Sequence, residues 1–469
     1  MSRKDDFVAT RPCGAAVMQL KAGVKKDGTL VALQARLYFD TGGYPGAQHS
    51  NGAALVQGPY RWPHLDVKSW SVYTNKAPAG PRRSLAAPHV HFAMESLLDT
   101  ISHALGRDPV QLRAKNAVKE GDHITGSLGM PFTIAEKTIR TAARKAGWSH
   151  RTRGPIQGTS KSRGVGIAAG HWTTWAGGSA ATVQINEDGT VSVVTGAINL
   201  TGTNTSFGQI TAEVLGIPMS TVTVHQGDTD TSPRNDGSWN SRVTFGTGEA
   251  VRRAAEDAKR QLAEALAEEL KARPEDIEVA DGKVRVNKSR AKPLSLAEAA
   301  SRAAEYRGAV VGRAALSDLW PPAVPICAQV AEVEVDRETG RVEVRRLVTA
   351  LDAGRAINPM SVEGQIEGAA SQGLGYALTE EYIYDKAGHL LNDGFMDFRM
   401  LTSLDHPKFE STLIEEAKDS GPYGAKGVGE PPLIPTAAAV ANAIYDAVGV
   451  RVMRLPITPE RIIRELSRA

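Results

Sequence analysis

Three segments of the chain alternate apolar and polar residues on either side of a short turn that contains Asp-Gly or Thr-Gly. They comprise residues 16–40, 181–198 and 328–352. Alternation with a period of two places the apolar side chains on one face of a strand, and Asp-Gly is a frequent turn between paired strands. The pattern therefore predicts three β-hairpins, which commits much of the chain to antiparallel sheet.

Other segments carry apolar residues at helical spacing. Helices are predicted at residues 90–105, from Pro109 onward, at 209–217, at 249–270 and from Thr436 onward. The second and third hairpins are each followed by a Gly-rich turn and a helix. This recurrence predicts an internal pseudo-repeat within a fold of the α+β class.

The chain of 469 residues is longer than one hydrophobic core usually serves, so at least two domains are expected. Residues 149–163 are polar, contain Gly and Pro, and show no periodicity, which is typical of a linker. We predict a first mixed α/β domain at residues 1–150. A second mixed domain, which contains the pseudo-repeat, is predicted at residues 163–469.

Charge, hydropathy and cysteine content exclude several classes of protein. A net charge of +3, with only short runs of basic residues, argues against a nucleic-acid partner. No apolar stretch approaches the roughly 20 residues that span a bilayer, and the N-terminus has no signal-peptide pattern, so a cytoplasmic location is expected. Cys13 and Cys327 cannot by themselves form a disulfide framework, a zinc site or an iron–sulfur cluster. Any iron–sulfur cluster is expected on another chain.

Three Gly-rich stretches are candidates for close contact between backbone and ligand: residues 196–205, 364–375 and 424–432. The third contains Glu430 in the sequence Gly-Val-Gly-Glu-Pro-Pro, where the two prolines hold the carboxylate at a rigid turn. Such a carboxylate is a candidate general base. The alternative is an N-cap or a surface acid before the helix that begins at Thr436.

Several motifs, in the same order along the chain, carry a resemblance to a known family. They are GPRRSLAAPH (80–89), FAMESLLDTISHALGRDPVQLRAKN (92–116), GDTDTSPRNDGSWNSRVT (227–244), GRAINPMSVEGQIEGAASQGLGYAL (354–378) and GAKGVGEPPLIPTAAAVANAIYDAVGV (424–450). The chain resembles the molybdopterin-binding subunits of the xanthine dehydrogenase and aldehyde oxidase family of molybdenum hydroxylases. The resemblance is to the C-terminal part of that large subunit, and it implies that residues 1–150 are the C-terminal part of a first molybdopterin-binding domain and residues 163–469 a second one.

The resemblance also implies roles for individual residues. Glu430 corresponds to the catalytic base beside molybdenum, and Arg83 to the arginine of the active-site loop. Cofactor-binding positions are implied at Gln372, Gly202, Thr203, Ser241, Arg242 and Thr244, and in the turn that supports the base at Lys426, Gly427 and Gly429. No residue of this chain is expected to bind the metal directly.

The active-site loop departs from the family pattern, because Ser84 and Ala86 replace glycines. Ser84 also stands where carbon monoxide dehydrogenases carry a copper-binding cysteine, and a hydroxyl is a poor ligand for copper. That activity is therefore not expected. Arg83 has an alternative interpretation too, in which it pairs with an acidic residue across a domain contact.

The resemblance implies molybdenum on molybdopterin, in the cytosine dinucleotide form, and a small aldehyde or N-heteroaromatic substrate. It implies 2Fe-2S clusters and FAD on partner subunits. The family's GGGFG loop has no counterpart here, so we expect a partner chain that carries the N-terminal half of the molybdenum subunit, or else a truncated gene product. Two alternatives for function stay open: a non-catalytic scaffold of the same family, and an acid–base hydrolase that uses Glu430 with His89 or His91.

Overall fold

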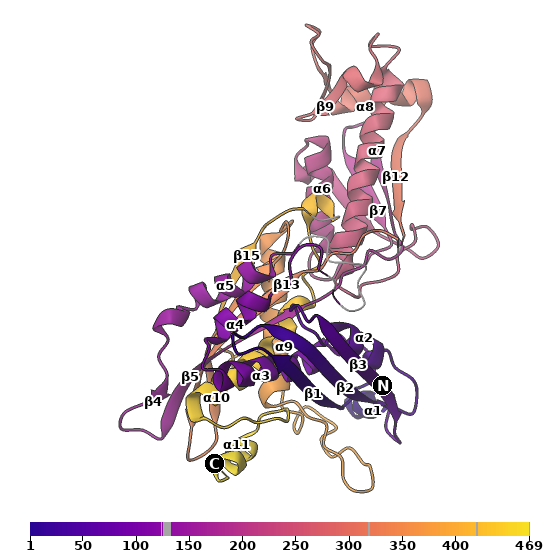
Figure 1. The fold of residues 1–469 in the computed structure, drawn as a ribbon. Helices are drawn as coiled ribbons and strands as arrows, with labels where there is room; N and C mark the ends of the chain where they lie inside the picture. The colour runs from indigo at the N-terminus through magenta and orange to yellow at the C-terminus, as the bar shows by residue number, and fades with distance from the viewer. Residues whose placement is uncertain (123, 125–132, 318, 419–420, 469) are drawn as a thin grey trace.

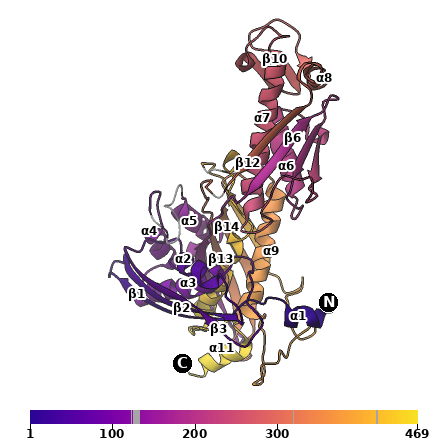
Figure 2. The same ribbon diagram turned by 90° about the vertical axis from the view of Figure 1, so that its right-hand side faces the viewer.

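The computed structural model describes residues 1–122, 124, 133–317, 319–418 and 421–468, which form an elongated molecule of two lobes (Figure 1). The lower lobe contains both ends of the chain. The upper lobe is built from the middle of the sequence, between β6 and β12. Figure 2 shows helix α9 running from the junction of the lobes down along the lower one.

The chain begins with a three-stranded sheet in the lower lobe, in the order β1-β2-β3. β1 and β2 are the antiparallel hairpin predicted at residues 16–40, and β3 pairs with β2 in parallel. The elements of this part are α1 (Arg3–Ala9), β1 (Ala16–Val24), β2 (Leu30–Gly42), α2 (Gln48–Leu55), β3 (His64–Tyr73), α3 (Ala87–Ala104), α4 (Pro109–Asn116) and α5 (Ala135–Lys145).

The upper lobe contains a four-stranded sheet in the order β12-β6-β7-β8 and a small sheet in the order β11-β10-β9. β6 and β7 are the hairpin predicted at residues 181–198. The elements are β6 (Ser179–Ile185), β7 (Val191–Thr195), α6 (Thr203–Leu215), β8 (Val222–Gln226), α7 (Gly248–Leu266), β9 (Ile277–Ala280), β10 (Lys283–Val286), β11 (Leu294–Ser295), α8 (Leu296–Arg307) and β12 (Val310–Leu316).

The lower lobe also contains a five-stranded sheet in the order β15-β14-β13-β5-β4. Strands β4 and β5 precede the upper lobe in the chain, and the other three follow it. β13 and β14 are the third predicted hairpin. The elements are β4 (Gly154–Pro155), β5 (Lys161–His171), β13 (Ile326–Asp336), β14 (Val342–Asp352), α9 (Pro359–Leu378), β15 (Lys408–Ile414), α10 (Thr436–Val448) and α11 (Pro459–Leu466).

The predicted pseudo-repeat is present in the connectivity of the two larger sheets. In each, an antiparallel hairpin is followed by a helix and by a third strand that is parallel to the second: β6-β7-α6-β8 and β13-β14-α9-β15. The next long helix then packs on strands of the same sheet, α7 on β12 and β6 and α10 on β5 and β13. The first sheet has the same order, β1-β2-α2-β3, so the unit occurs three times.

Glycines on two strands permit the close packing of these helices. A Cβ atom at Gly312 would collide with backbone atoms of Ala254 and Ala258 in α7, and one at Gly166 would collide with backbone atoms of α10. The facing helix surfaces are rich in alanine, so the helix backbones approach the sheets directly. Small residues are required on both sides of such a contact.

At two places the structure differs from what the sequence predicted. Residues 364–375, predicted as a Gly-rich stretch for close contact between backbone and ligand, lie inside α9, and Gly373 lets that helix pass against Thr436 of α10. The segment 149–163 contains the short strand β4, which pairs with β5. One hydrophobic core includes Ile139 and Trp148 on one side of this segment and Ile167 and Val330 on the other, so the domain boundary there stays a prediction.

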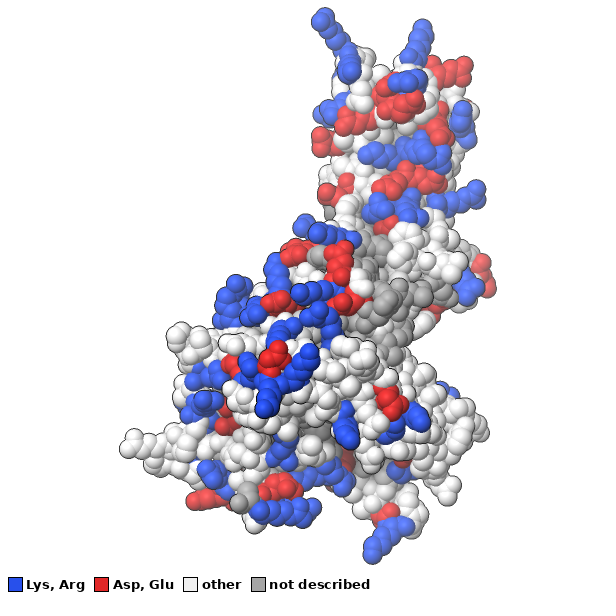
Figure 3. Space-filling model, viewed as in Figure 1, with Lys and Arg blue, Asp and Glu red and all other residues white. Residues whose placement is uncertain are grey.

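Acidic and basic side chains are interspersed over the face of the molecule seen in Figure 3. Among the helices that the structure describes, none has both the length and the apolar composition needed to cross a membrane.

Candidate active site

Glu430 lies at the end of the Gly-rich turn, directly before a 3-10 turn at Pro431–Leu433. Its carboxylate is not paired with a cation at ion-pair distance within the described part of the chain. Instead, two neutral donors from distant segments bind it. One is the backbone N–H of Ser84, 3.0 Å from Oε1, and the other is the hydroxyl of Ser241, 3.0 Å from Oε2.

The same two serines also bind the backbone of Glu430. The Ser84 hydroxyl donates to the Glu430 carbonyl oxygen at 2.7 Å, and the Glu430 N–H donates to Ser241 Oγ at 2.9 Å. Ser84 belongs to the active-site loop between β3 and α3, and Ser241 to the loop that precedes α7. Main chain and side chain are therefore both fixed, which preorganises the carboxylate.

Burial raises the pKa of Glu430 above its usual range, because a charged carboxylate loses water contacts there. The N–H of Ser84, the hydroxyl of Ser241 and the charge of Arg83 act in the opposite direction without overcoming burial. A carboxylate with a raised pKa is a stronger proton acceptor once it is ionised. Such perturbation within a cluster of polar groups is a common mark of an active site.

Arg83 joins the Glu430 turn to α9. Its Nε donates to the carbonyl oxygen of Gly429, and its Nη2 donates to Gln365, at 3.0 Å to the carbonyl oxygen and 2.8 Å to Oε1. Burial lowers the pKa of Arg83 to about 10, although the charge of Glu430 opposes the shift. The partners of Arg83 in the described residues are neutral, so the predicted alternative of an acidic partner is not observed at bonding distance.

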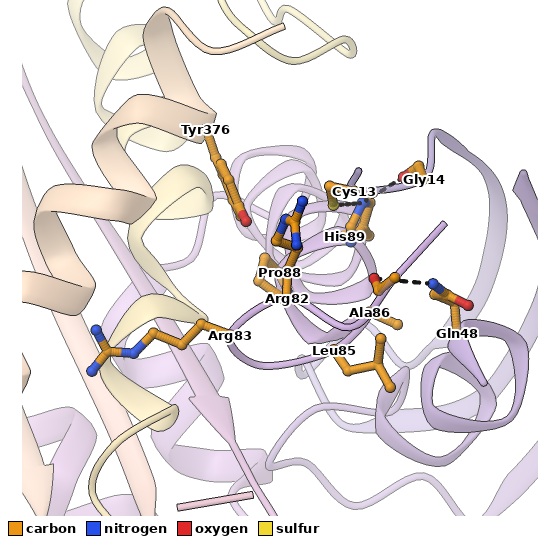
Figure 4. A pocket seen from close by; sticks show the side chains of 11 residues that line it. Cys13, Gly14, Gln48, Arg82, Arg83, Leu85, Ala86, Pro88, His89 and Tyr376 are labelled. Atoms are coloured by element: carbon orange, nitrogen blue, oxygen red, sulfur yellow. Dashed lines mark hydrogen bonds between the residues drawn. The ribbon is translucent and has the colours of Figure 1, made fainter. Parts of the chain in front are cut away.

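The second terminal nitrogen of Arg83, Nη1, makes no hydrogen bond within the described residues. It lies near Gly368 of α9, where a Cβ atom would be 3.8 Å away. The nearby Arg82 is exposed and turns to the other side of the loop, as Figure 4 shows. Arg83 thus has N–H groups left for a ligand, in addition to those that hold the turn.

Helix α9 presents a row of polar side chains to this region. Gln372, predicted as a cofactor contact, follows Gln365 by seven residues, which is about two helical turns, so the two share a face. Its amide donates to the hydroxyl of Tyr376, one turn further, at 3.3 Å. The sequence analysis missed Gln365, whose seven-residue spacing from Gln372 was the available signal.

Gly427 and Gly429 allow the Glu430 turn to lie against Ser241. A Cβ atom at Gly427 would collide with Thr174 and the Ser241 backbone, and one at Gly429 would come within 3.4 Å of both the Ser241 hydroxyl and Gln365 Oε1. Lys426 anchors the start of the turn, because its Nζ is 2.8 Å from Asp352 and both side chains are fully buried. The supporting function predicted for this turn fits its geometry.

Arg242 and Thr244, two further residues predicted to bind the cofactor, follow Ser241 in the chain. Arg242 is fully buried, and its guanidinium donates to the carbonyls of Ala176, Gly178 and Gly237. In this structure it therefore fixes the loop of Ser241. Thr244 lies in the next turn and is partly exposed.

Gly202 and Thr203 begin helix α6. Gly202 is the N-cap and has no side chain, but the side-chain oxygen of Asn199 accepts from the N–H of Asn204 in the first turn. A Cβ atom at Gly202 would lie 3.1 Å from the Ser361 hydroxyl in the first turn of α9. Two helix N-termini therefore meet at this point, and such ends favour anions and other hydrogen-bond acceptors.

The residues present fit a cofactor that is rich in acceptors. The amide of Gln372 and the open Nη1 of Arg83 are hydrogen-bond donors, and the buried side-chain oxygen of Asn204 in α6 is an acceptor without a partner in the described residues. These residues would hold a phosphate-bearing pterin. No cluster of three or more His, Cys, Asp or Glu side chains suited to a metal occurs in the described ranges.

The hydrolase alternative required His89 or His91 next to Glu430. His89 instead contacts Cys13, and His91 is buried and bonded to the carbonyl of Ala87. Neither imidazole has a hydrogen bond to Glu430 among the described contacts. The geometry therefore does not support that alternative.

Two family models, both described as molybdopterin cofactor-binding domains, match residues 1–117 and 138–407 of the chain. The xanthine dehydrogenase molybdenum-binding subunit of Escherichia coli O157:H7 is 34% identical over 494 residues, covering 100% of this chain and 64% of that protein. Subunit gamma of the 6-hydroxypseudooxynicotine dehydrogenase complex of Paenarthrobacter nicotinovorans is 30% identical, covering 98% of this chain and 61% of that subunit.

A solved structure has a similar fold. Quinoline 2-oxidoreductase from Pseudomonas putida 86 superposes with a TM-score of 0.90 at 28% identity, covering 100% of this chain and 64% of that one. The chain thus spans less than two thirds of the length of each of these relatives.

Proposed function

The chain belongs to the xanthine dehydrogenase and aldehyde oxidase family of molybdopterin-binding proteins, and on this premise we propose that it carries the general base of a molybdenum hydroxylase. The observation that carries the proposal is the surroundings of Glu430. Its carboxylate is partly buried, has a raised pKa and is held by two neutral donors rather than neutralised by a cation. A carboxylate kept only for structure would be expected to have a charged partner.

Molybdopterin with molybdenum, when bound, supplies the two-electron oxidation of a substrate carbon and its hydroxylation with oxygen from water. Glu430 accepts the proton that this hydroxylation releases. Ser84 and Ser241 keep the carboxylate oriented while it does so, since each bonds to both its side chain and its backbone. The free N–H groups of Arg83 would stabilise negative charge that develops on the substrate.

The substrate proposed is a small aldehyde or N-heteroaromatic compound. Support comes from the relatives, whose names refer to xanthine, 6-hydroxypseudooxynicotine and quinoline. We further propose the cytosine dinucleotide form of the cofactor, held at Gln372, at the start of α6 and near the loop of Ser241, Arg242 and Thr244. The 2Fe-2S clusters and FAD that pass the electrons on would belong to partner subunits, as a relative named as one subunit of a complex suggests.

The test is a metal and isotope analysis of the complex purified from its native host. We expect molybdenum and pterin in a 1:1 ratio with this chain, and incorporation of ¹⁸O from labelled water into the product of an N-heteroaromatic or aldehyde substrate. A complex that contains no molybdenum would favour the scaffold alternative. A complex that contains molybdenum but takes oxygen from O₂ would contradict the proposed chemistry.

A further inference from the structure

A second cluster of reactive side chains lies on the other side of the active-site loop from Glu430. It surrounds a small pocket that is lined by Cys13, Gly80, Arg82, His89 and Tyr376, among others (Figure 4). The family's motifs did not include Cys13, and the proposed mechanism uses none of these side chains. Figure 4 shows Arg83 pointing away from the pocket, while Cys13 and His89 meet at its edge.

Cys13 and His89 form a thiol–imidazole pair. The sulfur of Cys13 lies 3.6 Å from Nε2 of His89, and the same nitrogen lies 3.2 Å from the carbonyl oxygen of Gly14. A carbonyl can only accept, so Nε2 carries a proton and can donate to both atoms. Because Cys13 is exposed, a small reagent can reach its sulfur.

The charged groups around this pair favour the thiolate. The protein atoms packed around the thiol oppose its ionisation, but the charge and hydrogen bond of His89 and the charge of Arg82 lower the Cys13 pKa below its usual range. Burial lowers the pKa of His89, but the charge and hydrogen bond of Cys13, together with the carbonyl oxygens of Gly14 and Ala86, outweigh it, so the pKa of His89 is raised. Glu380 faces the thiol and opposes its ionisation, but burial raises the pKa of Glu380 to about 7, which limits its negative charge.

Two further polar groups complete the pocket. Tyr376 brings a hydroxyl from α9, and burial raises its pKa, so it stays a neutral donor. Gln48 is 5% exposed and lines the same pocket, where its side-chain amide donates to the carbonyl oxygen of Gly80 at 3.3 Å (Figure 4).

We propose that Cys13 is a modification site at which hydroperoxides oxidise the thiolate to a sulfenic acid. The sulfur lone pair attacks one peroxide oxygen, so that an S–O bond forms and the O–O bond breaks. The sulfur loses two electrons, and the peroxide is reduced. His89 gives its proton to the departing oxygen, which leaves as water when the reagent is hydrogen peroxide.

Cys327 provides an internal control. It lies in strand β13, is 0% exposed, and burial raises its pKa far above the usual value for a thiol. A thiol of this kind is inert at neutral pH because it is rarely ionised and cannot be reached. The two cysteines of the chain therefore have opposite expected reactivities.

The experiment treats the native complex with hydrogen peroxide, traps sulfenic acid with dimedone, and locates the adduct on this chain by mass spectrometry. We expect the adduct at Cys13 and none at Cys327. His89→Gln should slow labelling of Cys13 at pH 7 by roughly tenfold, since less of the thiol is ionised. The exposed His64 offers a matched control, because His64→Gln should leave the rate unchanged.

A second measurement covers the case in which His89→Gln does not fold. The rate at which iodoacetamide alkylates Cys13 of the wild-type complex is followed against pH, and its midpoint should lie below that of an ordinary cysteine. A midpoint at or above the ordinary value, or equal labelling of Cys13 and Cys327, would overturn the proposal. Neither measurement depends on molybdopterin, so failure here would leave the proposed function untouched.

Discussion

Two glutamates in this chain, Glu95 and Glu430, lie in opposite kinds of environment. Glu95, on α3, is fully buried and 2.7 Å from the equally buried guanidinium of Arg113, while Tyr60 donates to its other oxygen at 2.5 Å. Glu430 has two neutral donors, and the nearest guanidinium, that of Arg83, bonds to backbone and amide oxygens instead. Both glutamates belong to motifs shared with the family, so the motifs alone do not separate their roles.

The difference teaches how a fold keeps one carboxylate for structure and another for chemistry. An ion pair within the core satisfies the charge of Glu95 and locks α3 to α4, and both oxygens of that carboxylate are occupied by Arg113 and Tyr60. Neutral donors orient Glu430 without neutralising it.

The largest effect on stability is expected from Glu95→Gln. The amide cannot balance the charge of Arg113, so the variant should lose about 3–5 kcal/mol of unfolding free energy, as buried pairs do when one partner is removed. Denaturant titration would measure it. The control is Glu278→Gln, which breaks an exposed pair with Arg285 and should cost under about 1 kcal/mol. Similar losses of unfolding free energy in both variants would contradict the structural role of the Glu95–Arg113 pair.

Glu430→Gln should have the opposite effect to Glu95→Gln: it should lower turnover and leave the stability unchanged. The variant keeps the shape of the side chain and its bond with Ser84, so assembly, molybdenum content and melting temperature should stay close to wild type. Turnover should fall by about 10²-fold or more, because the general base is lost. Steady-state kinetics would check this, with the exposed Glu367→Gln as control. Activity within about tenfold of wild type would contradict the assignment.

Arg83→Met, compared with Arg82→Met, tests the guanidinium that neighbours Glu430. Loss of a charge-stabilising donor should lower the turnover number by about 10²-fold. Because the variant also loses the bonds to Gly429 and Gln365, a modest fall in melting temperature is expected as well. Exposed Arg82 should change neither quantity. A lower melting temperature with unchanged turnover would make Arg83 a positioning residue only.

Ser241→Ala tests the neutral donors through pH. The Ser241 hydroxyl lowers the pKa of Glu430, so its removal should raise that pKa further above the usual range. The base works when it is ionised, and activity is therefore lost as the pH falls through its pKa. The acid limb of kcat/KM should thus move to higher pH in the variant. A limb that moves to lower pH, or does not move, would contradict the role of Ser241.

The fold class and the three hairpins are confirmed because local patterns determine them. Alternation and turn residues specify each hairpin without reference to the rest of the chain, and amphipathic spacing specifies helices such as α7. The parallel third strand of each unit could not be predicted in this way, because it joins segments separated by a helix. The Gly-rich stretch 364–375 was not predicted to be helical, and Gly373 there serves the packing of α9 against α10.

The centre of the site was predicted from the Gly-Val-Gly-Glu-Pro-Pro turn, and the structure brings Arg83, Ser241 and Gly429 to Glu430. The bonds of Ser84 were not predicted, because they form between residues 346 positions apart. The same is true of Cys13, which appears isolated in the sequence and meets His89 only in the folded chain. The roles of the cofactor residues stay predictions.

The smallest effect concerns the active-site loop, which departs from the family pattern at Ser84 and Ala86. Both residues have left-handed backbone conformations, with φ of 64° each, in place of the family's glycines. Such a conformation costs a residue with a side chain roughly 1–2 kcal/mol. Ser84 offsets this through its bonds to Glu430, but Ala86 offers only a buried methyl group.

Ala86→Gly should therefore be nearly neutral for the unfolding free energy. Relief of the left-handed conformation offsets the loss of a methyl group, worth about 0.8 kcal/mol, and the added freedom of the unfolded chain, worth about 0.5–1 kcal/mol. The neighbouring Ala87→Gly is the matched control. Ala87 is equally buried and lies in α3 itself, so the same substitution has nothing to relieve and should cost about 1–2 kcal/mol. Equal losses at the two positions would show that the loop near Glu430 is no more strained than the helix that follows it.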